Sequence, residues 1–210
     1  RGLGDVYKRQ QQIITIGGNC LVSQAPFDYL HGLYPNAGIL WLDAHPDVSM
    51  PKDGYPNAHA MVLGALLGAG EPSMAGLMKN PAFKPDELLY VGLQGLHDYQ
   101  AEFLNDLGVD YKVQTEDFVS DDDIRAFVQK FDHVLVHLDI DVLDPQCFHS
   151  TYFANPSLVG DGSGGGRMTM EQLASILHLV AANSEIAGLT IAEYLPFDEE
   201  RLHKLFGSLK

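Results

Sequence analysis

Two short acidic motifs each follow an apolar run, and their residue types are those of a metal site. The first reads DAHPD and begins at Asp43; the second reads DID and begins at Asp139. Alternate residues of an extended chain point the same way, so Asp43, His45 and Asp47 can converge just beyond a strand. Asp139 and Asp141 can do the same after the second run. The spacing therefore predicts two sets of side chains that meet at one place.

Carboxylates that converge without basic partners repel one another strongly, and a divalent cation or a pair of cations removes that repulsion. Oxygen-rich ligation with one imidazole suits Mn²⁺ or Mg²⁺ better than softer metals. A single DxD motif is weak evidence, because Asp is common in loops after strands. Two motifs on two apolar strands predict a metal site whose ligands are Asp43, His45, Asp47, Asp139 and Asp141.

The elements that must position these residues alternate along the chain. Five apolar runs, over residues 12–16, 38–42, 88–93, 133–138 and 188–192, are typical of buried parallel strands. Helical patterns cover residues 58–67, 99–107, 121–131, 169–182 and 199–209. The alternation predicts a single α/β domain, a three-layer α/β/α structure with a mostly parallel sheet. Such sheets bind ligands beyond the carboxyl ends of their strands, where both acidic motifs fall.

Composition excludes several classes of partner. The net charge is −15, with 28 acidic and 13 basic residues, which argues against a nucleic-acid or anionic-membrane surface. No apolar run approaches the roughly 18 residues that span a membrane, and no signal peptide is visible. Two cysteines without a CxxC motif fit a reducing compartment. We therefore expect a cytoplasmic protein.

The first ten residues, RGLGDVYKRQ, lack an initiating Met and any clear periodicity. We expect residues 1–10 to be a non-native linker, and residues 11–210 to be an α/β domain that lacks its N-terminal part. A missing strand or helix would leave an exposed sheet edge.

The sequence resembles the arginase/agmatinase (ureohydrolase) family at these motifs, and the two Asp motifs are highly specific as a pair. WLDAHPD looks like the family's DAHxD motif, and HLDIDVLDP looks like its SxDxDxxDP motif. The resemblance runs from about Ile13 to the C-terminus. The matching segments, in chain order, are WLDAHPD at 41–47, NAH at 57–59, HLDIDVLDP at 137–145, GG at 165–166 and the glutamate at 193.

The resemblance implies an arginase-like fold and a metal-dependent hydrolase that cleaves a non-peptide C–N bond of a guanidino or amidino compound (a linear amidine). Two Mn²⁺ ions would share a hydroxide that attacks the substrate carbon. Asp47 would orient that hydroxide, Glu193 would hold the cationic head of the substrate, and His59 would move protons. Asn57 and Ser49 would line the substrate end. The family is usually oligomeric, which implies a homo-oligomer.

One metal position departs from the family pattern. The family has a ligand His in a GGDH segment, where this chain reads GGNC and places Cys20. A thiolate is a poor partner for Mn²⁺, so the second site is either empty or filled by Zn²⁺ or Fe²⁺ through Cys20, or else Cys20 is simply a small buried residue. His137 stands where the family has Ser and faces the same way as Asp139. It is either a replacement imidazole or a buried hydrogen-bonded histidine. We expect one or two bound ions.

The substrate end also departs from the family. Ser49 stands where arginases carry an Asn, and in the loop over residues 94–98 only Asp98 remains as a carboxylate. The sequence therefore does not favour arginine as the substrate. Two alternatives stay open: a degenerate family protein with one metal or none and a structural or regulatory role, and a metal-dependent amide deacylase. His59 and Glu193 favour the enzyme, whereas Cys20 favours degeneracy.

Overall fold

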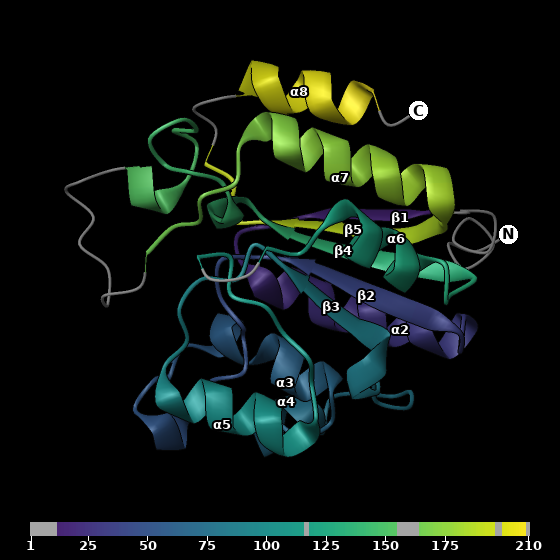
Figure 1. Ribbon diagram of the computed structural model, residues 1–210. Helices are drawn as coiled ribbons and strands as arrows, with labels where there is room; N and C mark the ends of the chain where they lie inside the picture. The colour runs from purple at the N-terminus through teal and green to yellow at the C-terminus, as the bar shows by residue number, and fades with distance from the viewer. Residues whose placement is uncertain (1–11, 116–117, 155–163, 196–198, 209–210) are drawn as a thin grey trace, which may run out of the picture.

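Five parallel strands form one sheet in the order β1-β5-β4-β2-β3 (Figure 1). The computed structural model describes residues 12–115, 118–154, 164–195 and 199–208, so the predicted linker over residues 1–10 lies outside the described residues. The strands are β1 (Ile13–Ile16), β2 (Ala37–Leu42), β3 (Leu88–Val91), β4 (His133–Asp139) and β5 (Glu185–Ala192). All five predicted strands and the parallel sheet are confirmed.

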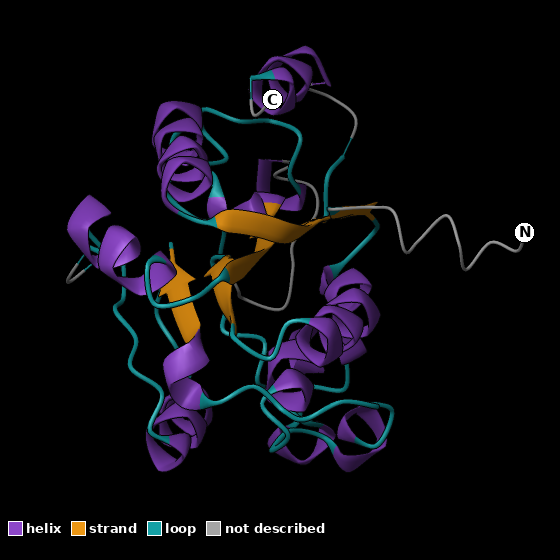
Figure 2. Ribbon diagram, turned by 90° about the vertical axis from the view of Figure 1, so that its right-hand side faces the viewer, coloured by secondary structure: helices purple, strands orange, loops and turns teal. Residues whose placement is uncertain are grey.

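Helices cover both faces of this sheet, as the turned view in Figure 2 shows. One face carries α2 (Gln24–Leu33), α3 (Val62–Leu66), α4 (Pro72–Ala75) and α5 (Asp98–Leu107); the other carries α6 (Asp121–Val128), α7 (Met170–Asn183) and α8 (Glu199–Gly207). The predicted three-layer α/β/α architecture is confirmed. Within the described residues, no helix combines the length and apolar character needed to cross a bilayer.

Alternate side chains of β2 pack against the helices on opposite faces of the sheet. Ile39 and Trp41 pack in the apolar cluster under α2 and α3, whereas Leu40 and Leu42 pack in the cluster under α6 and α7. All four side chains are fully buried, as expected of a central parallel strand that is covered on both faces.

Helix boundaries follow capping chemistry where the sequence offers it. Ser120 and Thr169 cap α6 and α7, each with a reciprocal capping box, as the sequence predicts. The predicted helix over 58–67 instead begins as a 3-10 turn (Ala58–Met61) before α3. The strand predicted to run to residue 93 ends at Val91, because Gly92 turns the chain with φ of 95°. Helix α2 has no side-chain N-cap bond and was not predicted from the sequence.

The strand order makes the boundary between β2 and β4 a topological switch point. The connection that leaves β2 leads to β3 on one side, and the connection that leaves β4 leads to β5 on the other. In open α/β sheets, ligands bind at such a switch point, outside the carboxyl ends of the strands. Asp43 follows β2 directly and Asp139 ends β4, so the two acidic motifs flank this switch point.

Candidate metal centre

Four strands deliver acidic or sulfur side chains to the same edge of the sheet. Asp43 follows β2, Asp139 ends β4, and Asp141 lies in the 3-10 turn that comes next. Glu193 follows β5, and Cys20 opens the 3-10 turn after β1. Because the strands are parallel, all these ends meet at one edge. Except for Glu193, which is partly buried, these side chains are almost fully buried.

Potential metal-binding atoms from these elements lie within 4.8 Å of one another in three overlapping groups. The groups are Cys20/Asp43/His137/Asp139, Asp43/His45/Asp141 and Asp139/Asp141/Glu193. Asp43, Asp139 and Asp141 each belong to two groups, so cations in neighbouring positions could share a carboxylate. The structure thus brings together four of the five predicted ligands, and adds Cys20, His137 and Glu193.

Backbone and indole N–H groups hold the carboxylates in place. Asp43 accepts hydrogen bonds from the Trp41 indole at 3.0 Å and from the His45 backbone at 2.7 Å. Asp139 accepts one from the backbone of Asp141 at 2.8 Å. Bonds of this kind fix ligand orientation before any cation arrives. Trp41 is therefore part of the site as well as of the core.

The buried carboxyl groups titrate abnormally because they crowd together. Burial, then the charges of Asp141 and Asp43, raise the pKa of Glu193 to about 7. Burial and neighbouring aspartates also raise the pKa of Asp139 and of Asp141. For Asp43 burial is outweighed by the nearby imidazoles of His137 and His45, which lower its pKa to about 2. A cation could replace the protons that this cluster otherwise retains.

His45 faces the carboxylates with one ring nitrogen. Its Nδ1 is 3.0 Å from Oδ2 of Asp141 and 3.6 Å from Oδ1 of Asp43. Burial opposes the charged imidazole, but the charge and hydrogen bond of Asp141 raise the pKa of His45 well above its usual value. In the absence of metal, His45 thus acts as the cation that these carboxylates require.

His137 is a fully buried histidine with one satisfied and one unsatisfied ring nitrogen. Its Nδ1 is 2.7 Å from the hydroxyl of Ser23 and 3.2 Å from that of Thr190, and the two hydroxyls are 2.7 Å apart. Its Nε2 has no hydrogen-bond partner and is 3.7 Å from Oδ2 of Asp43. The ring stacks on Trp41 with centroids 3.7 Å apart. Sequence reasoning missed Ser23 and Thr190.

Asp47 lies outside the three groups but beside them. It is buried, its Oδ2 has no hydrogen-bond partner, and its backbone carbonyl accepts the N–H groups of Leu63 and Gly64 at the start of α3. Burial and the charge of Asp43 raise its pKa, whereas the nearby Cys20 thiol opposes the rise. Its backbone is left-handed, with φ of 51°.

Two residues of the site have a left-handed backbone conformation. Among the residues that the structure describes, only Asp47 and Glu193 combine a side chain with a positive φ, and both are predicted site residues. Such conformations cost of order 1–3 kcal/mol and persist where function holds them.

That strain predicts a difference between two substitutions at one position. The free energy of unfolding should be about 1 kcal/mol higher for Asp47→Gly than for Asp47→Ala, since glycine adopts positive φ without strain. Chemical denaturation of the metal-free variants measures the difference. Asp139 has φ of −80° and serves as the matched control. There Asp139→Gly should be no more stable than Asp139→Ala, and an equal glycine advantage at both positions would contradict the explanation.

Two of the predicted substrate residues, Ser49 and Asn57, lie outside the three donor groups, whereas Glu193 belongs to one of them. Ser49 is buried, and its hydroxyl bonds the Tyr99 hydroxyl and the Gln100 amide, each at 3.1 Å. Asn57 is exposed at the start of the 3-10 turn, and His59 is partly buried, edge-on to the ring of Tyr55 with centroids 6.2 Å apart. Tyr99 and Gln100 of α5 were not predicted from sequence.

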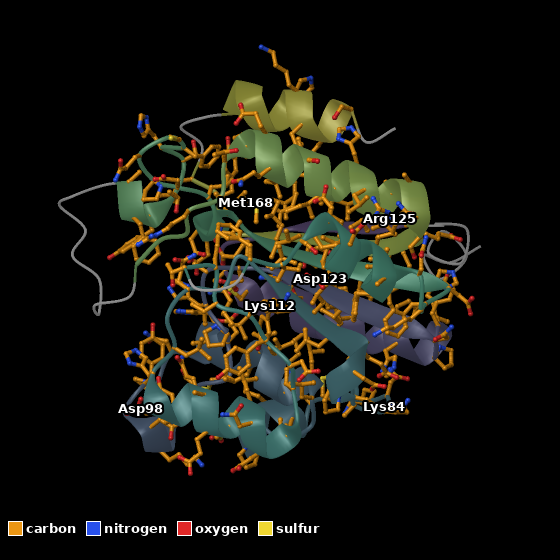
Figure 3. The ribbon with its side chains drawn as sticks, viewed as in Figure 1. Lys84, Asp98, Lys112, Asp123, Arg125 and Met168 are labelled. Carbon is orange, nitrogen blue, oxygen red and sulfur yellow. The ribbon has the colours of Figure 1, made fainter. Side chains whose placement is uncertain are left out.

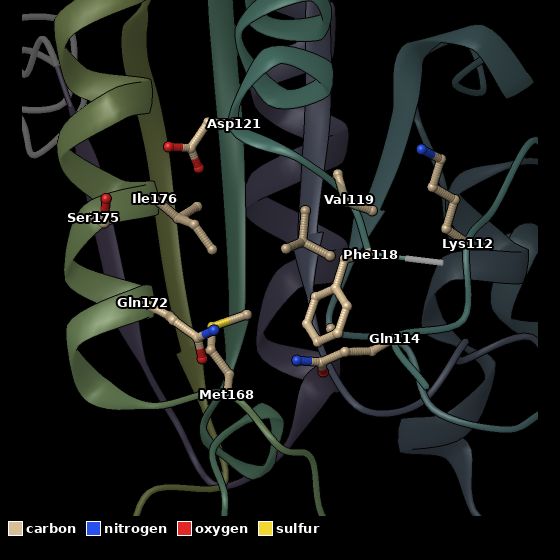
Figure 4. Close-up of a pocket in the computed structure, with 11 residues that line it drawn as sticks. Lys112, Gln114, Phe118, Val119, Asp121, Met168, Gln172, Ser175 and Ile176 are labelled. Atoms are coloured by element: carbon tan, nitrogen blue, oxygen red, sulfur yellow. The ribbon is translucent and has the colours of Figure 1, made fainter. Parts of the chain in front are cut away.

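A separate pocket of about 150 Å³ opens between α7 and the segment before α6, and its lining includes none of the predicted site residues. Figure 4 shows Gln114 and Phe118 facing Met168 and Gln172 across it. In the wider view of Figure 3, Lys112 lies near α6; its Nζ is 3.0 Å from Oδ2 of Asp123, which ties this segment to the helix.

Both the sequence and the fold match those of known proteins. The sequence model of the arginase family matches residues 1–204. The arginase of Bacillus caldovelox is 25% identical over 185 residues, which cover 84% of this chain and 61% of that protein. The chain thus spans about three-fifths of the length of that curated relative.

Solved structures agree on the fold. The native arginase from Bacillus caldovelox superposes with a TM-score of 0.81 at 24% identity, covering 98% of this chain and 70% of that one. An Entamoeba histolytica arginase in complex with L-ornithine gives a TM-score of 0.77 at 23% identity, covering 95% and 69%. With the family's sequence model matching almost from end to end, and its fold present, this chain belongs to the arginase family.

Proposed function

We propose that the protein is a metal-dependent hydrolase of the ureohydrolase type, which cleaves a C–N bond of a guanidino or amidino compound. The observation that carries the proposal is the convergence of three overlapping donor groups at the carboxyl ends of β1, β2, β4 and β5 within an arginase fold. Carboxyl groups buried this closely cost free energy unless a cation or protons neutralise them.

The donor atoms fit manganese at two of the three groups. Asp43, His45 and Asp141 offer two carboxylates and one imidazole, and Asp139, Asp141 and Glu193 offer carboxylates alone. This chemistry suits Mn²⁺. When bound, the metal would supply a water that ionises near neutral pH.

The chain's own residues would then bind the substrate and move protons. Glu193 sits at the end of β5, partly buried beside Asp139 and Asp141, and its carboxylate would hold a cationic guanidinium or amidinium. Asp47 would accept a hydrogen bond from the attacking water. His59, partly buried on the neighbouring turn, would carry protons between the site and solvent.

The substrate we propose differs from arginine at its far end. Ser49 is engaged with Tyr99 and Gln100, and Asp98 is exposed at the start of α5. Asn57 and Ser49 would shape this end of the site. The L-ornithine complex of the Entamoeba histolytica arginase shows an amino acid bound to that relative. Here we expect a guanidino or amidino compound with a different tail.

The proposal extends to the class of partner, the cellular compartment and the oligomeric state. The net charge of −15 argues against nucleic acid as a partner. Neither Cys20 nor Cys147 forms a disulfide, which fits the cytoplasm. We propose a homo-oligomer, in keeping with the family resemblance, and light scattering of the purified protein measures its size.

The test is a screen for product release. The metal-free protein is loaded with Mn²⁺, its metal content is measured, and guanidino and amidino compounds of varied tail are assayed for urea or ammonia. We expect turnover of at least one compound, lowered more than about 100-fold in Glu193→Gln. Glu185→Gln, which alters an exposed residue at the other end of β5, is the matched control.

Cys20 gives a specific reason to test a second function. Metal bound by the carboxylates without release of product from any compound would support a degenerate family member with a structural or regulatory role. Cleavage of simple amides, with guanidino compounds untouched, would instead indicate a deacylase. Protein that binds no divalent metal would end the proposal.

A further inference from the structure

We propose that Cys20, Asp43, His137 and Asp139 form a zinc position of mixed thiolate, imidazole and carboxylate character, with His137 as a metal ligand. The inference rests on the metal centre of the proposed function, and it assigns a different cation to one part of that centre. The neighbouring oxygen-rich groups keep their preference for Mn²⁺, so the two positions would hold unlike metals.

The four donors already surround one point. The thiol of Cys20 donates to Oδ2 of Asp139 at 3.0 Å, and Nε2 of His137 is 3.7 Å from Oδ2 of Asp43. All four ligand atoms lie within 4.8 Å of one another. Tetrahedral Zn²⁺, with bonds of about 2.0–2.3 Å, places its donors roughly 3.3–3.8 Å apart. Small side-chain shifts would therefore complete the coordination.

His137 can direct a free lone pair toward that point, in the tautomer that carries its proton on Nδ1. Its Nδ1 faces the hydroxyls of Ser23 and Thr190, and a chain in which Nδ1–H donates to Ser23 and Ser23 donates to Thr190 satisfies all three groups. Nε2 then carries the lone pair. It is fully buried, has no partner, and is too far from Asp43 for a hydrogen bond.

A buried acceptor atom that has no hydrogen-bond partner and lies beside a carboxylate favours the binding of a cation. Metal-binding histidines almost always donate their second ring N–H to a fixed partner, and Ser23 is placed to accept such a bond from Nδ1 of His137. The stack on Trp41 fixes the ring plane as well.

The donor set selects the metal. Thiolate and imidazole ligands favour Zn²⁺ over Mn²⁺, and a four-coordinate site with one sulfur is common for zinc and foreign to manganese. Only this group contains sulfur among the donor groups of the described residues. The structure therefore contains one soft position beside harder ones.

X-ray absorption at the zinc edge tests the assignment directly. Metal-free protein receives one equivalent of Zn²⁺, and we expect one sulfur neighbour at about 2.3 Å. Replacement of Zn²⁺ by Co²⁺ should give a thiolate charge-transfer band in the near ultraviolet. A zinc spectrum that contains only nitrogen and oxygen neighbours would overturn the proposal without any variant being made.

Variants separate the two new ligands. Cys20→Ser should remove the sulfur signal, and His137→Gln should keep it, while each lowers zinc affinity at least about tenfold. Cys147→Ser and His133→Gln, at the exposed cysteine and at the start of the same strand, should change neither. Unchanged zinc affinity in both Cys20→Ser and His137→Gln would refute the proposal.

Manganese distinguishes this inference from the proposed function. His45→Ala should lower Mn²⁺ binding and leave the zinc–sulfur signal in place. If Mn²⁺ binds and product is released but zinc shows no sulfur, only the zinc position fails. If neither metal binds, both proposals fail together.

Discussion

Replacing Asp139 with asparagine is expected to weaken metal binding strongly. Asp139 belongs to two of the three donor groups, and its carboxyl is almost fully buried between them. Loss of an outer partner of a ligand already costs about 10–100-fold in metal affinity, so loss of this shared ligand should cost more than about 100-fold. Metal content after dialysis measures the loss, and hydrolysis should fall in proportion.

The same substitution should stabilise the metal-free protein. Burial and the charges of its neighbours raise the pKa of Asp139, so its carboxyl is unfavourable without a cation. Asp144→Asn is the control, because Asp144 shares the DIDVLDP segment but lies outside the donor groups and accepts the backbone N–H of Gln146. If Asp139→Asn retained two cations, or Asp144→Asn lost them, the assigned ligands would be wrong.

Raising the pH from 5 to 8 is expected to destabilise the metal-free protein. The folded pKa of Glu193 is about 7, against a usual value of 4.5, so the folded state binds more protons than the unfolded state between these values. Stability therefore falls as the pH rises through that window, by about 2 to 3 kcal/mol for this group alone. For a chain of this size, that is a fall in Tm of roughly 5–10 °C.

Divalent metal should abolish most of this fall, because a bound cation replaces the protons that the cluster loses. Thermal unfolding at several pH values, with and without Mn²⁺, provides the measurement. Glu193→Gln should flatten the metal-free curve between pH 4.5 and 7. His137, whose pKa burial lowers, works in the opposite direction below pH 6.5, so the variant must be compared with the parent chain at each pH. A metal-free Tm that rose steadily from pH 5 to 8 would contradict the prediction.

The three-layer fold and the sheet edge that carries the metal centre could be predicted from the sequence, because both depend on patterns among neighbouring residues. Apolar runs with acidic residues directly after them identify β2 and β4, and parallel strands bring their ends to the same edge. The capping boxes at Ser120 and Thr169 mark two helix starts locally. Helix α2 offers no such signal: its N-cap Ser23 makes no cap bond, because its hydroxyl bonds His137 instead.

The parts that escaped prediction depend on register between distant strands. His137 pairs with Trp41 on one side and with Thr190 on the other, and neither pairing can be read from the chain without the strand order. A threonine inside an otherwise apolar strand was the available signal for Thr190. The contact of Ser49 with Tyr99 and Gln100 depends on how α5 packs against a loop some 50 residues earlier, which no local pattern encodes.

Trp41 gives the protein a built-in optical reporter. It is the sole tryptophan of the chain, its ring stacks on His137, and its indole N–H bonds the Asp43 carboxylate. Any ion that draws electrons from either partner will alter the emission of that ring, and a paramagnetic ion such as Mn²⁺ or Co²⁺ will quench it. Fluorescence in solution can therefore follow the filling of the two positions in real time, without a label.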